Sequence, residues 1–156
     1  MQSGILYHYI TGQEAVIEPY FETINGQRTQ ITSVVVPIRR NGRVIGVAGI
    51  DLEFIDIHEI VSHIKPYEEG YSVIFSNSGI IVSHPDVSQI GKNINFSELG
   101  LTGFKFNNSN KQTIISNIQN ENIIVVIIPF YIGNSDNNWY AMSVVSENAI
   151  RISWDK

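Results

Sequence analysis

The chain has 156 residues, of which 43% are hydrophobic and 16% charged, with no cysteine and a formal net charge of -5. This composition excludes a disordered chain, and the length suits one domain or two small modules that share a core. The acidic balance and the dispersed Lys and Arg residues argue against a nucleic-acid partner. The lack of cysteine excludes disulfides, thiolate metal sites and a cysteine nucleophile.

The sequence contains no apolar run of the roughly 20 residues that a membrane helix requires. The longest such run covers residues 123–130. The amino-terminal segment also lacks the basic region and the apolar core of a signal peptide. We therefore expect any membrane anchor to lie outside this chain.

A β-hairpin is predicted around Asn41-Gly42, which lies between two segments rich in β-branched residues. An Asn-Gly pair in this position is the strongest short-range hairpin signal, because both residues can adopt a positive φ. A two-residue turn pairs Thr32 with Asp51 on a face that is otherwise apolar. A carboxylate on such a face needs polar partners, so Asp51 is either a hydrogen-bonded structural residue or a ligand anchor.

A second turn is predicted at Asn25-Gly26, and its type decides which face the preceding strand presents. A two-residue turn would place Tyr20 and Glu22 on the face opposite Asp51. A type I turn with a glycine bulge shifts the register by one residue, and such a shift moves every side chain to the other face. We favour the bulged turn, which predicts that both side chains lie beside Asp51 in one polar cluster.

Alternating and continuous apolar runs, separated by Gly, Asn and Pro, predict further strands. The predicted strands cover residues 29–38, 43–52, 71–75, 80–84, 104–106, 112–118, 123–128 and 139–145. The run at residues 123–128 is unbroken, which predicts a central strand covered on both faces.

Two helices are predicted between and after these strands. The first has apolar residues at helical spacing, with Asp56 and Glu59 forming a capping box and Pro66 ending the helix. The second covers residues 147–154. The short connector after Pro66 is the best candidate for a module boundary, and the whole pattern predicts an α+β fold of antiparallel sheets flanked by helices.

Catalytic and metal-binding patterns are not supported. His58 and His63 are five residues apart, whereas a zinc helix needs two histidines four apart on one face. A nucleophile elbow is not present, and His84-Pro85-Asp86 is typical of a turn that ends a strand. We therefore predict no catalytic residue, no metal site and no cofactor.

Several segments, taken together in their order and spacing, resemble the double Cache sensor domain, from about Tyr7 to about Asn148. The segments that carry the resemblance are residues 18–20, 32–37, 46–52, 70–75, 78–81, 84–86, 90–92 and 138–140. The resemblance implies an extracytoplasmic sensor that lies between two membrane helices of a chemotaxis receptor, a sensor histidine kinase or a cyclic-di-GMP enzyme.

The resemblance also implies two PAS-like modules. Residues 1–65 correspond to a partial membrane-distal module with its connecting helix, and residues 66–156 to a complete membrane-proximal module. We expect the domain to be shortened at its amino terminus, because the long first helix and first strands of the family have no counterpart here.

In family members that bind amino acids, the distal pocket commonly uses a Tyr-x-Asp segment and the aspartate of a Gly-x-x-Gly-x-Asp strand. The matching residues are Tyr20, Glu22 and Asp51, and Thr32 lies on the same predicted face. The acids would neutralise a cationic group while Tyr20 packs on its apolar part. The implied partner is an amino acid, an amine or a carboxylate, with a homodimer formed through the parent receptor. The alternative is a structural or dimerisation module without a ligand.

Overall fold

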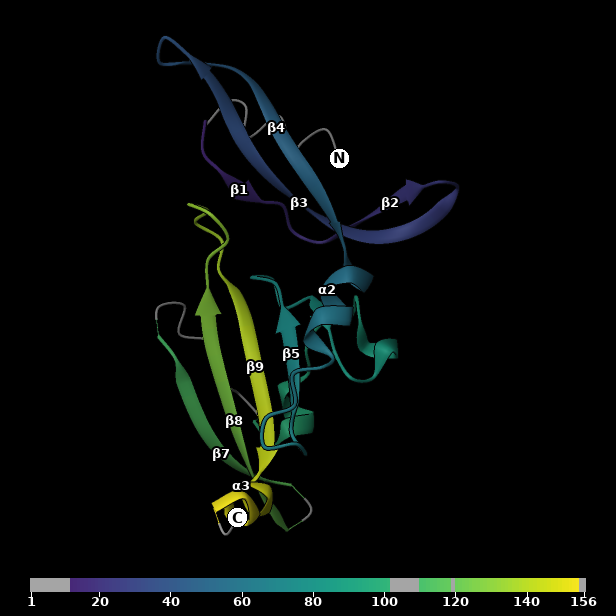
Figure 1. The fold of residues 1–156 in the computed structure, drawn as a ribbon, viewed down its shortest axis with the longest axis vertical. Coiled ribbons are helices and arrows are strands. Elements are labelled where there is room, and N and C mark those ends of the chain that lie inside the picture. The colour runs from purple at the N-terminus through teal and green to yellow at the C-terminus, as the bar shows by residue number, and fades with distance from the viewer. Residues whose placement is uncertain (1–11, 102–109, 119, 155–156) are drawn as a thin grey trace.

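The computed structural model describes residues 12–101, 110–118 and 120–154, and it contains two antiparallel sheets, one above the other along the molecule (Figure 1). In the first sheet, β1 and β2 follow one another along one edge of β3, and β4 pairs with the other edge. Its strands are β1 (Ala15–Val16), β2 (Tyr20–Ile24), β3 (Gln27–Arg40) and β4 (Arg43–Glu53).

The second sheet has the strand order β6-β5-β9-β8-β7, so that β9 is its middle strand. Its strands are β5 (Tyr71–Phe75), β6 (Ile81–Ser83), β7 (Gln112–Ile118), β8 (Glu121–Phe130) and β9 (Trp139–Ser146). These strands confirm the predictions at residues 71–75, 80–84, 112–118, 123–128 and 139–145. The strand predicted at residues 104–106 lies outside the described residues.

Residues 123–128 form an interior strand as predicted, because β8 lies between β9 and β7, but the prediction that both faces are covered is wrong. Within β8, Val125 and Ile127 are buried, whereas Ile128 is 44% exposed and the intervening residues are only half-buried. An unbroken apolar run does not reveal which alternate positions are covered, and here one face of β8 supplies most of the core residues.

The helix α2 (Phe54–Val61) begins directly where β4 ends, and it lies between the two sheets (Figure 1). The predicted capping box is wrong, because the N-cap is Glu53, and it makes no side-chain cap hydrogen bond. The buried Phe54 starts the helix two residues before Asp56, which instead lies in the first turn, where an acid favours the helix dipole.

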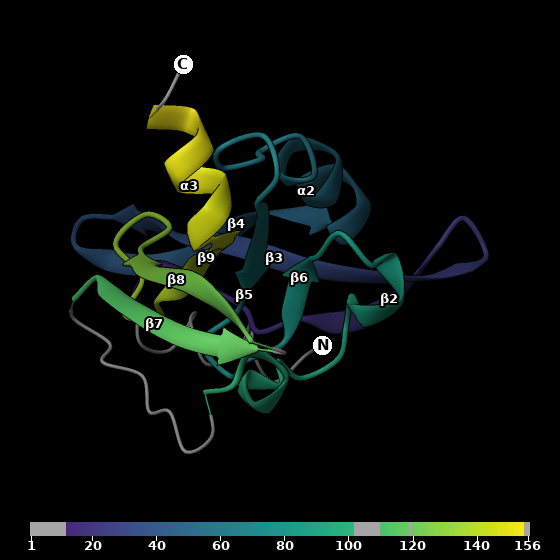
Figure 2. The same cartoon turned by 90° about the horizontal axis from the view of Figure 1, so that it is seen from below.

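The helix α3 (Glu147–Trp154) confirms its predicted bounds and lies at the end of the molecule opposite the first sheet. Viewed from below, α2 and α3 lie on the same side of the second sheet (Figure 2). Two short 3-10 helices, η1 (Val87–Gln89) and η2 (Phe96–Leu99), belong to the long connection between β6 and β7. Within the described parts of the chain, every helix is too short or too polar to span a bilayer.

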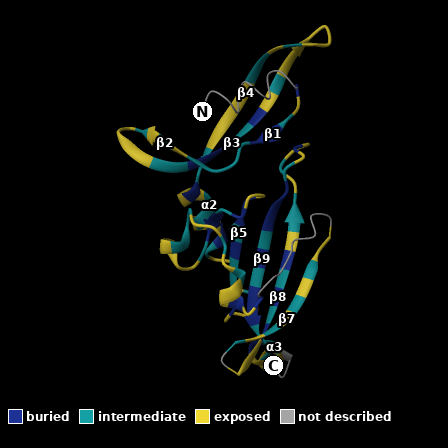
Figure 3. Ribbon diagram, turned by 180° about the vertical axis from the view of Figure 1, so that it is seen from behind, coloured by how far each residue is buried: buried dark blue, intermediate teal, exposed yellow. Residues whose placement is uncertain are grey.

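The main core lies on one face of the second sheet. Phe75 is fully buried and stacks on Tyr140 with ring centroids 5.1 Å apart, and Phe96 of η2 meets Phe75 edge-on at 6.0 Å. This core continues along β8 and β9, and β9 is mostly buried (Figure 3). The second sheet therefore has a core of its own.

A smaller cluster on the opposite face of the second sheet joins it to the first sheet and to α2. Its buried residues are Val16, Phe54, Val82 and Trp139. A polar contact reinforces this junction, because the hydroxyls of Ser76 and Ser78 donate to Glu18 Oε2 at 2.7 and 2.5 Å. These contacts fix the position of the first sheet over the second and confirm the predicted α+β architecture.

Candidate ligand-binding site

The turn at Asn25-Gly26 determines the position of Tyr20. Asn25 and Gly26 both have positive φ, of 51° and 81°, and the strands pair without a bulge across this turn. The predicted bulged turn is therefore wrong, because an Asn-Gly pair satisfies the two-residue turn by itself. Tyr20 pairs with Ile31 as a consequence.

In the hairpin of β3 and β4, around Asn41-Gly42, the structure has a bulge that was not predicted from the sequence. The two-residue turn of this hairpin is confirmed, but a bulge close to the turn leaves Ile45 unpaired and shifts the register of β3 against β4 by one residue. Asp51 consequently pairs with Ser33. Thr32 lies on the other face, where it is fully buried and its hydroxyl donates to the Ile17 carbonyl at 2.6 Å. The predicted position of Thr32 beside Asp51 is wrong.

The two register shifts cancel, so Tyr20, Glu22 and Asp51 lie on one face of the first sheet. Ser33 connects two of them. Its hydroxyl donates to Asp51 Oδ1 at 2.5 Å, and its oxygen lies 2.7 Å from the Tyr20 hydroxyl. Because the one proton of Ser33 goes to Asp51, the Tyr20 hydroxyl donates to Ser33. The result is a directed chain of hydrogen bonds that ends on a carboxylate.

Glu22 lies on the same face but farther along the sheet. Its strand partner is Thr29, four residues from Ser33, which corresponds to roughly 13 Å along β3. Its carboxylate accepts the neighbouring Thr23 N–H at 3.0 Å. In this arrangement Glu22 and Asp51 do not surround a single ammonium group.

Sequence reasoning missed one polar residue of this face, Ser33, and the face also carries Glu53, two residues beyond Asp51 in β4. Glu53 pairs with Ile31 and therefore lies between the levels of Asp51 and Glu22. The signal that could have revealed Ser33 was Gly46, because a glycine inside a strand often marks a bulge, and one bulge places Ser33 instead of Thr32 opposite Asp51.

The chemistry of this face is suited to binding. The Asp51 side chain is accessible to solvent, whereas Ser33 is only 3% exposed and holds one carboxylate oxygen in place. An accessible carboxylate with a fixed oxygen can accept a hydrogen bond from a cation or another donor. Among the residues that the structure describes, His, Asp and Glu nowhere form a group of three that could hold a metal ion.

Comparison with known proteins places this arrangement in context. The model of the family described as Cache domain matches residues 4–151 of the chain. The methyl-accepting chemotaxis protein PscA of Pseudomonas syringae pv. tomato is 30% identical over 80 residues, which are 51% of this chain and 12% of PscA. The corresponding protein PctB of Pseudomonas aeruginosa is 30% identical over 83 residues, which are 53% of this chain and 13% of PctB. The chain thus spans a small part of these relatives.

Solved structures share the fold over most of the chain. The ligand-binding domain of PctB in complex with L-Arg has a TM-score of 0.67 and 23% identity, covering 94% of this chain and 59% of that chain. The ligand-binding domain of the Pseudomonas fluorescens chemoreceptor CtaA in complex with L-leucine has a TM-score of 0.64 and 24% identity, covering 88% of this chain and 55% of that chain. The predicted PAS-like fold is confirmed by these similarities.

Proposed function

The chain belongs to the Cache domain family, and from this membership we propose that it is the extracytoplasmic small-molecule sensing part of a membrane-bound receptor. In this proposal residues 1–65 are part of the membrane-distal module and residues 66–156 form the membrane-proximal module. The parent protein is a chemotaxis receptor or a sensor histidine kinase. The domain binds its ligand and makes or breaks no covalent bond.

The observation that carries the proposal is the hydrogen-bond chain from Tyr20 through Ser33 to Asp51. Ser33 holds one oxygen of the carboxylate, so Asp51 needs no reorientation when a cationic group arrives, and preorganised groups bind more tightly. Tyr20 adds an aromatic ring next to the same carboxylate, on which an ammonium group or an apolar side chain can pack.

The charge of this face indicates the class of ligand. Asp51, Glu53 and Glu22 all lie on it, so a simple carboxylate would meet like charges, whereas an ammonium group would be attracted. We therefore favour an amino acid or an amine. This agrees with the titles of the PctB and CtaA structures, which are complexes with L-Arg and L-leucine.

Signalling would follow from a change in helix packing. A ligand can shift a conformational equilibrium only by the difference in its affinity for the two states. Closure of the site around a ligand bound at Asp51 would move β4. This strand continues directly into α2, and α2 packs against the second sheet. The carboxyl-terminal helix α3 would carry the change toward the membrane.

Titration calorimetry tests the proposal directly. The wild-type chain and Asp51→Ala are titrated with a panel of amino acids, amines and small carboxylates, with Asp56→Ala as the matched control. Asp56 is exposed on α2 and does not belong to the hydrogen-bond chain. We expect binding of an ammonium compound that Asp51→Ala weakens at least tenfold, because charge-assisted hydrogen bonds are worth about 1.5–3 kcal/mol. Binding that survives Asp51→Ala unchanged would remove Asp51 from the site.

A second candidate function, dimerisation without a ligand, is favoured by one observation. Val36, Ile38 and Ile50 lie on the face opposite Asp51, and they are 41%, 45% and 62% exposed. Apolar side chains gathered on a surface often mark an interaction site. Light scattering distinguishes the two functions: a stable dimer that Ile50→Asp dissociates, combined with no binding across the ligand panel, would favour the dimerisation module.

A further inference from the structure

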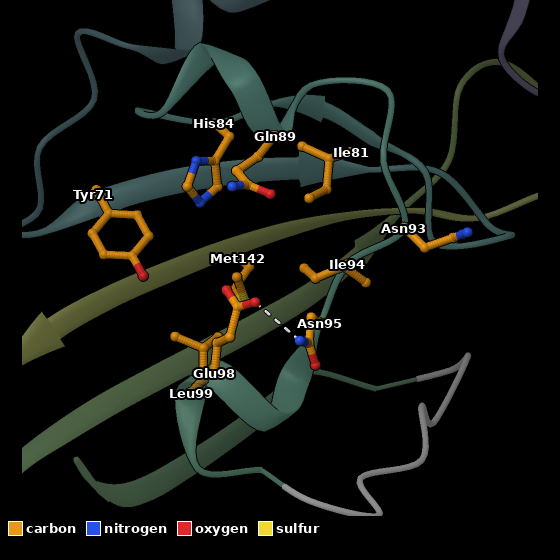
Figure 4. Close-up of a pocket in the computed structure, with 10 residues that line it drawn as sticks. All are labelled: Tyr71, Ile81, His84, Gln89, Asn93, Ile94, Asn95, Glu98, Leu99 and Met142. Carbon is orange, nitrogen blue, oxygen red and sulfur yellow. Dashed lines mark hydrogen bonds between the residues drawn. The ribbon is translucent and has the colours of Figure 1, made fainter.

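The second sheet has a cavity of about 220 Å³ on the face that carries its main core, away from the first sheet. The cavity lies between η2, β5, β6 and β9 (Figure 4). Its apolar part comes from Ile81, Leu99 and Met142, which are all buried. Pockets for drug-sized ligands measure about 300–1,000 Å³, so this cavity suits a smaller molecule.

Three polar side chains converge on this cavity from separate segments of the chain. Tyr71 comes from β5, His84 from the end of β6, and Glu98 from η2. Figure 4 shows the Tyr71 hydroxyl and the Glu98 carboxylate turned toward the same space, below the ring of His84. The rings of Tyr71 and His84 meet edge-on, with centroids 5.9 Å apart, which fixes their relative orientation.

The hydrogen bonds around the cavity determine what it offers to a ligand. The Asp86 N–H donates to His84 Nδ1 at 3.0 Å, and the same nitrogen lies 3.2 Å from the Asp86 carbonyl oxygen, so His84 is held at the end of β6. Asn95 Nδ2 donates to Glu98 Oε1 at 2.9 Å and holds the carboxylate in place. Within the described parts of the chain, neither Glu98 Oε2 nor the Tyr71 hydroxyl has a hydrogen-bond partner.

The charge of the described cavity wall favours a cationic ligand over an anionic one. Among its described lining residues, Glu98 is the acid, and neither Lys nor Arg contributes to the wall. Burial, and to a lesser degree the charge of Glu98, raises the pKa of Tyr71, so its hydroxyl keeps its proton. Glu98 Oε2 and the face of the Tyr71 ring can both attract a cation.

We propose that this cavity is a second ligand site, which binds a small primary amine with a short apolar chain. The ammonium group donates to Glu98 Oε2 and lies beside Tyr71, while the apolar chain lies against Met142 and Leu99. The site is independent of Asp51, because it lies on the other sheet. A ligand here contacts β9, whose chain continues directly into α3.

The chain offers a specific probe of this cavity. It contains two methionines, Met1 and Met142, so labelling methionine methyl groups with carbon-13 gives two NMR signals, one of which reports on the cavity wall. The full chain is titrated with isobutylamine, and with isobutanol and isobutyrate as uncharged and anionic molecules of similar shape. We expect isobutylamine to move the Met142 signal saturably and at lower concentration than isobutanol, whereas isobutyrate leaves it in place.

Two variants test the polar contacts, and a third is the control. Glu98→Gln keeps the size of the side chain and should weaken the binding of isobutylamine at least tenfold. Tyr71→Phe should weaken this binding severalfold. Glu69→Gln changes an exposed acid that does not line the cavity, and should leave the titration unchanged. An unliganded Met142 signal that differs from that of the urea-unfolded chain shows that each variant is folded.

The proposal would be overturned by a Met142 signal that isobutylamine does not move, or by an equal response to isobutylamine and isobutanol. A titration midpoint that Glu98→Gln leaves unchanged would also overturn it. None of these results affects the proposed function, because that proposal is tested by calorimetry on Asp51→Ala, and the Met142 methyl group reports on the second sheet alone.

Discussion

The two sheets of this molecule bury their apolar residues to very different degrees. In the first sheet, Phe21 is 50% exposed and Ile50 62% exposed, whereas Phe75 and Val125 of the second sheet are completely buried. The second sheet packs on η2 on one face and on α2 and the first sheet on the other. The difference indicates that the second sheet supplies most of the stability, and that the first sheet presents accessible side chains on a supported surface.

The largest expected effect contrasts one aromatic residue in each sheet. Phe75→Ala should lower the free energy of unfolding by about 3–5 kcal/mol, because it opens a cavity in the stacked core. Phe21→Ala is the control and should cost about 1 kcal/mol or less, because that ring packs mainly under the Arg28 guanidinium, 3.9 Å away. Urea denaturation measures both changes. Equal losses would contradict the contrast between the sheets.

A smaller effect tests how closely β3 and β4 pack beside Asp51. A Cβ at Gly49 would come within 2.9 Å of Val35 Cγ1 and 3.0 Å of the Val34 carbonyl. We expect Gly49→Ala to cost about 1–3 kcal/mol in thermal or urea denaturation. At Gly46 in the same strand, the nearest atom would be 3.8 Å away, so Gly46→Ala should change stability by no more than about 0.5 kcal/mol. If Gly49→Ala leaves the free energy of unfolding unchanged, β3 and β4 can move apart at this point without a measurable cost in stability.

The junction between the sheets should contribute less. Glu18→Ala removes the acceptor of two hydroxyls, but it also removes Glu18 Oε1, which is buried without a hydrogen-bond partner in the described structure. These effects partly offset each other, so we expect a loss of about 1 kcal/mol. Glu69→Ala, at an exposed acid, should change stability by less than about 0.5 kcal/mol. A loss at Glu18 as large as at Phe75 would show that the junction dominates stability.

The smallest expected effect concerns Asp86, in the connection between β6 and β7, and its contribution to the stability of the fold at acid pH. Hydrogen bonds from Ser88 and Gln89 lower the pKa of Asp86. Because the folded-state pKa is depressed, Asp86 stabilises the fold above its unfolded pKa of about 3.9, and this contribution is lost as the pH falls through the folded value. Carboxyl NMR titration should give a midpoint below that of an unstructured peptide. A midpoint at or above the peptide value would contradict these hydrogen bonds.

Much of the fold could be predicted because it depends on neighbouring residues. The two Asn-Gly pairs specify their turns through backbone preferences alone. The bounds of α3 and β7 follow from local periodicity. The start of α2 did not follow, because burial of Phe54 outweighs the capping signal of Asp56. The predicted common face of Tyr20, Glu22 and Asp51 is correct only because two register errors of one residue each cancel.

By itself, the sequence determined the α+β class, the two hairpins and the family resemblance. Only the tertiary structure decided that Ser33, and not Thr32, lies beside Asp51, and that Tyr71, His84 and Glu98 surround one cavity. The physical reason is that a strand repeats every two residues. One bulge therefore moves every side chain beyond it to the other face, and residues distant in sequence meet only when the strands assemble into sheets with a common core.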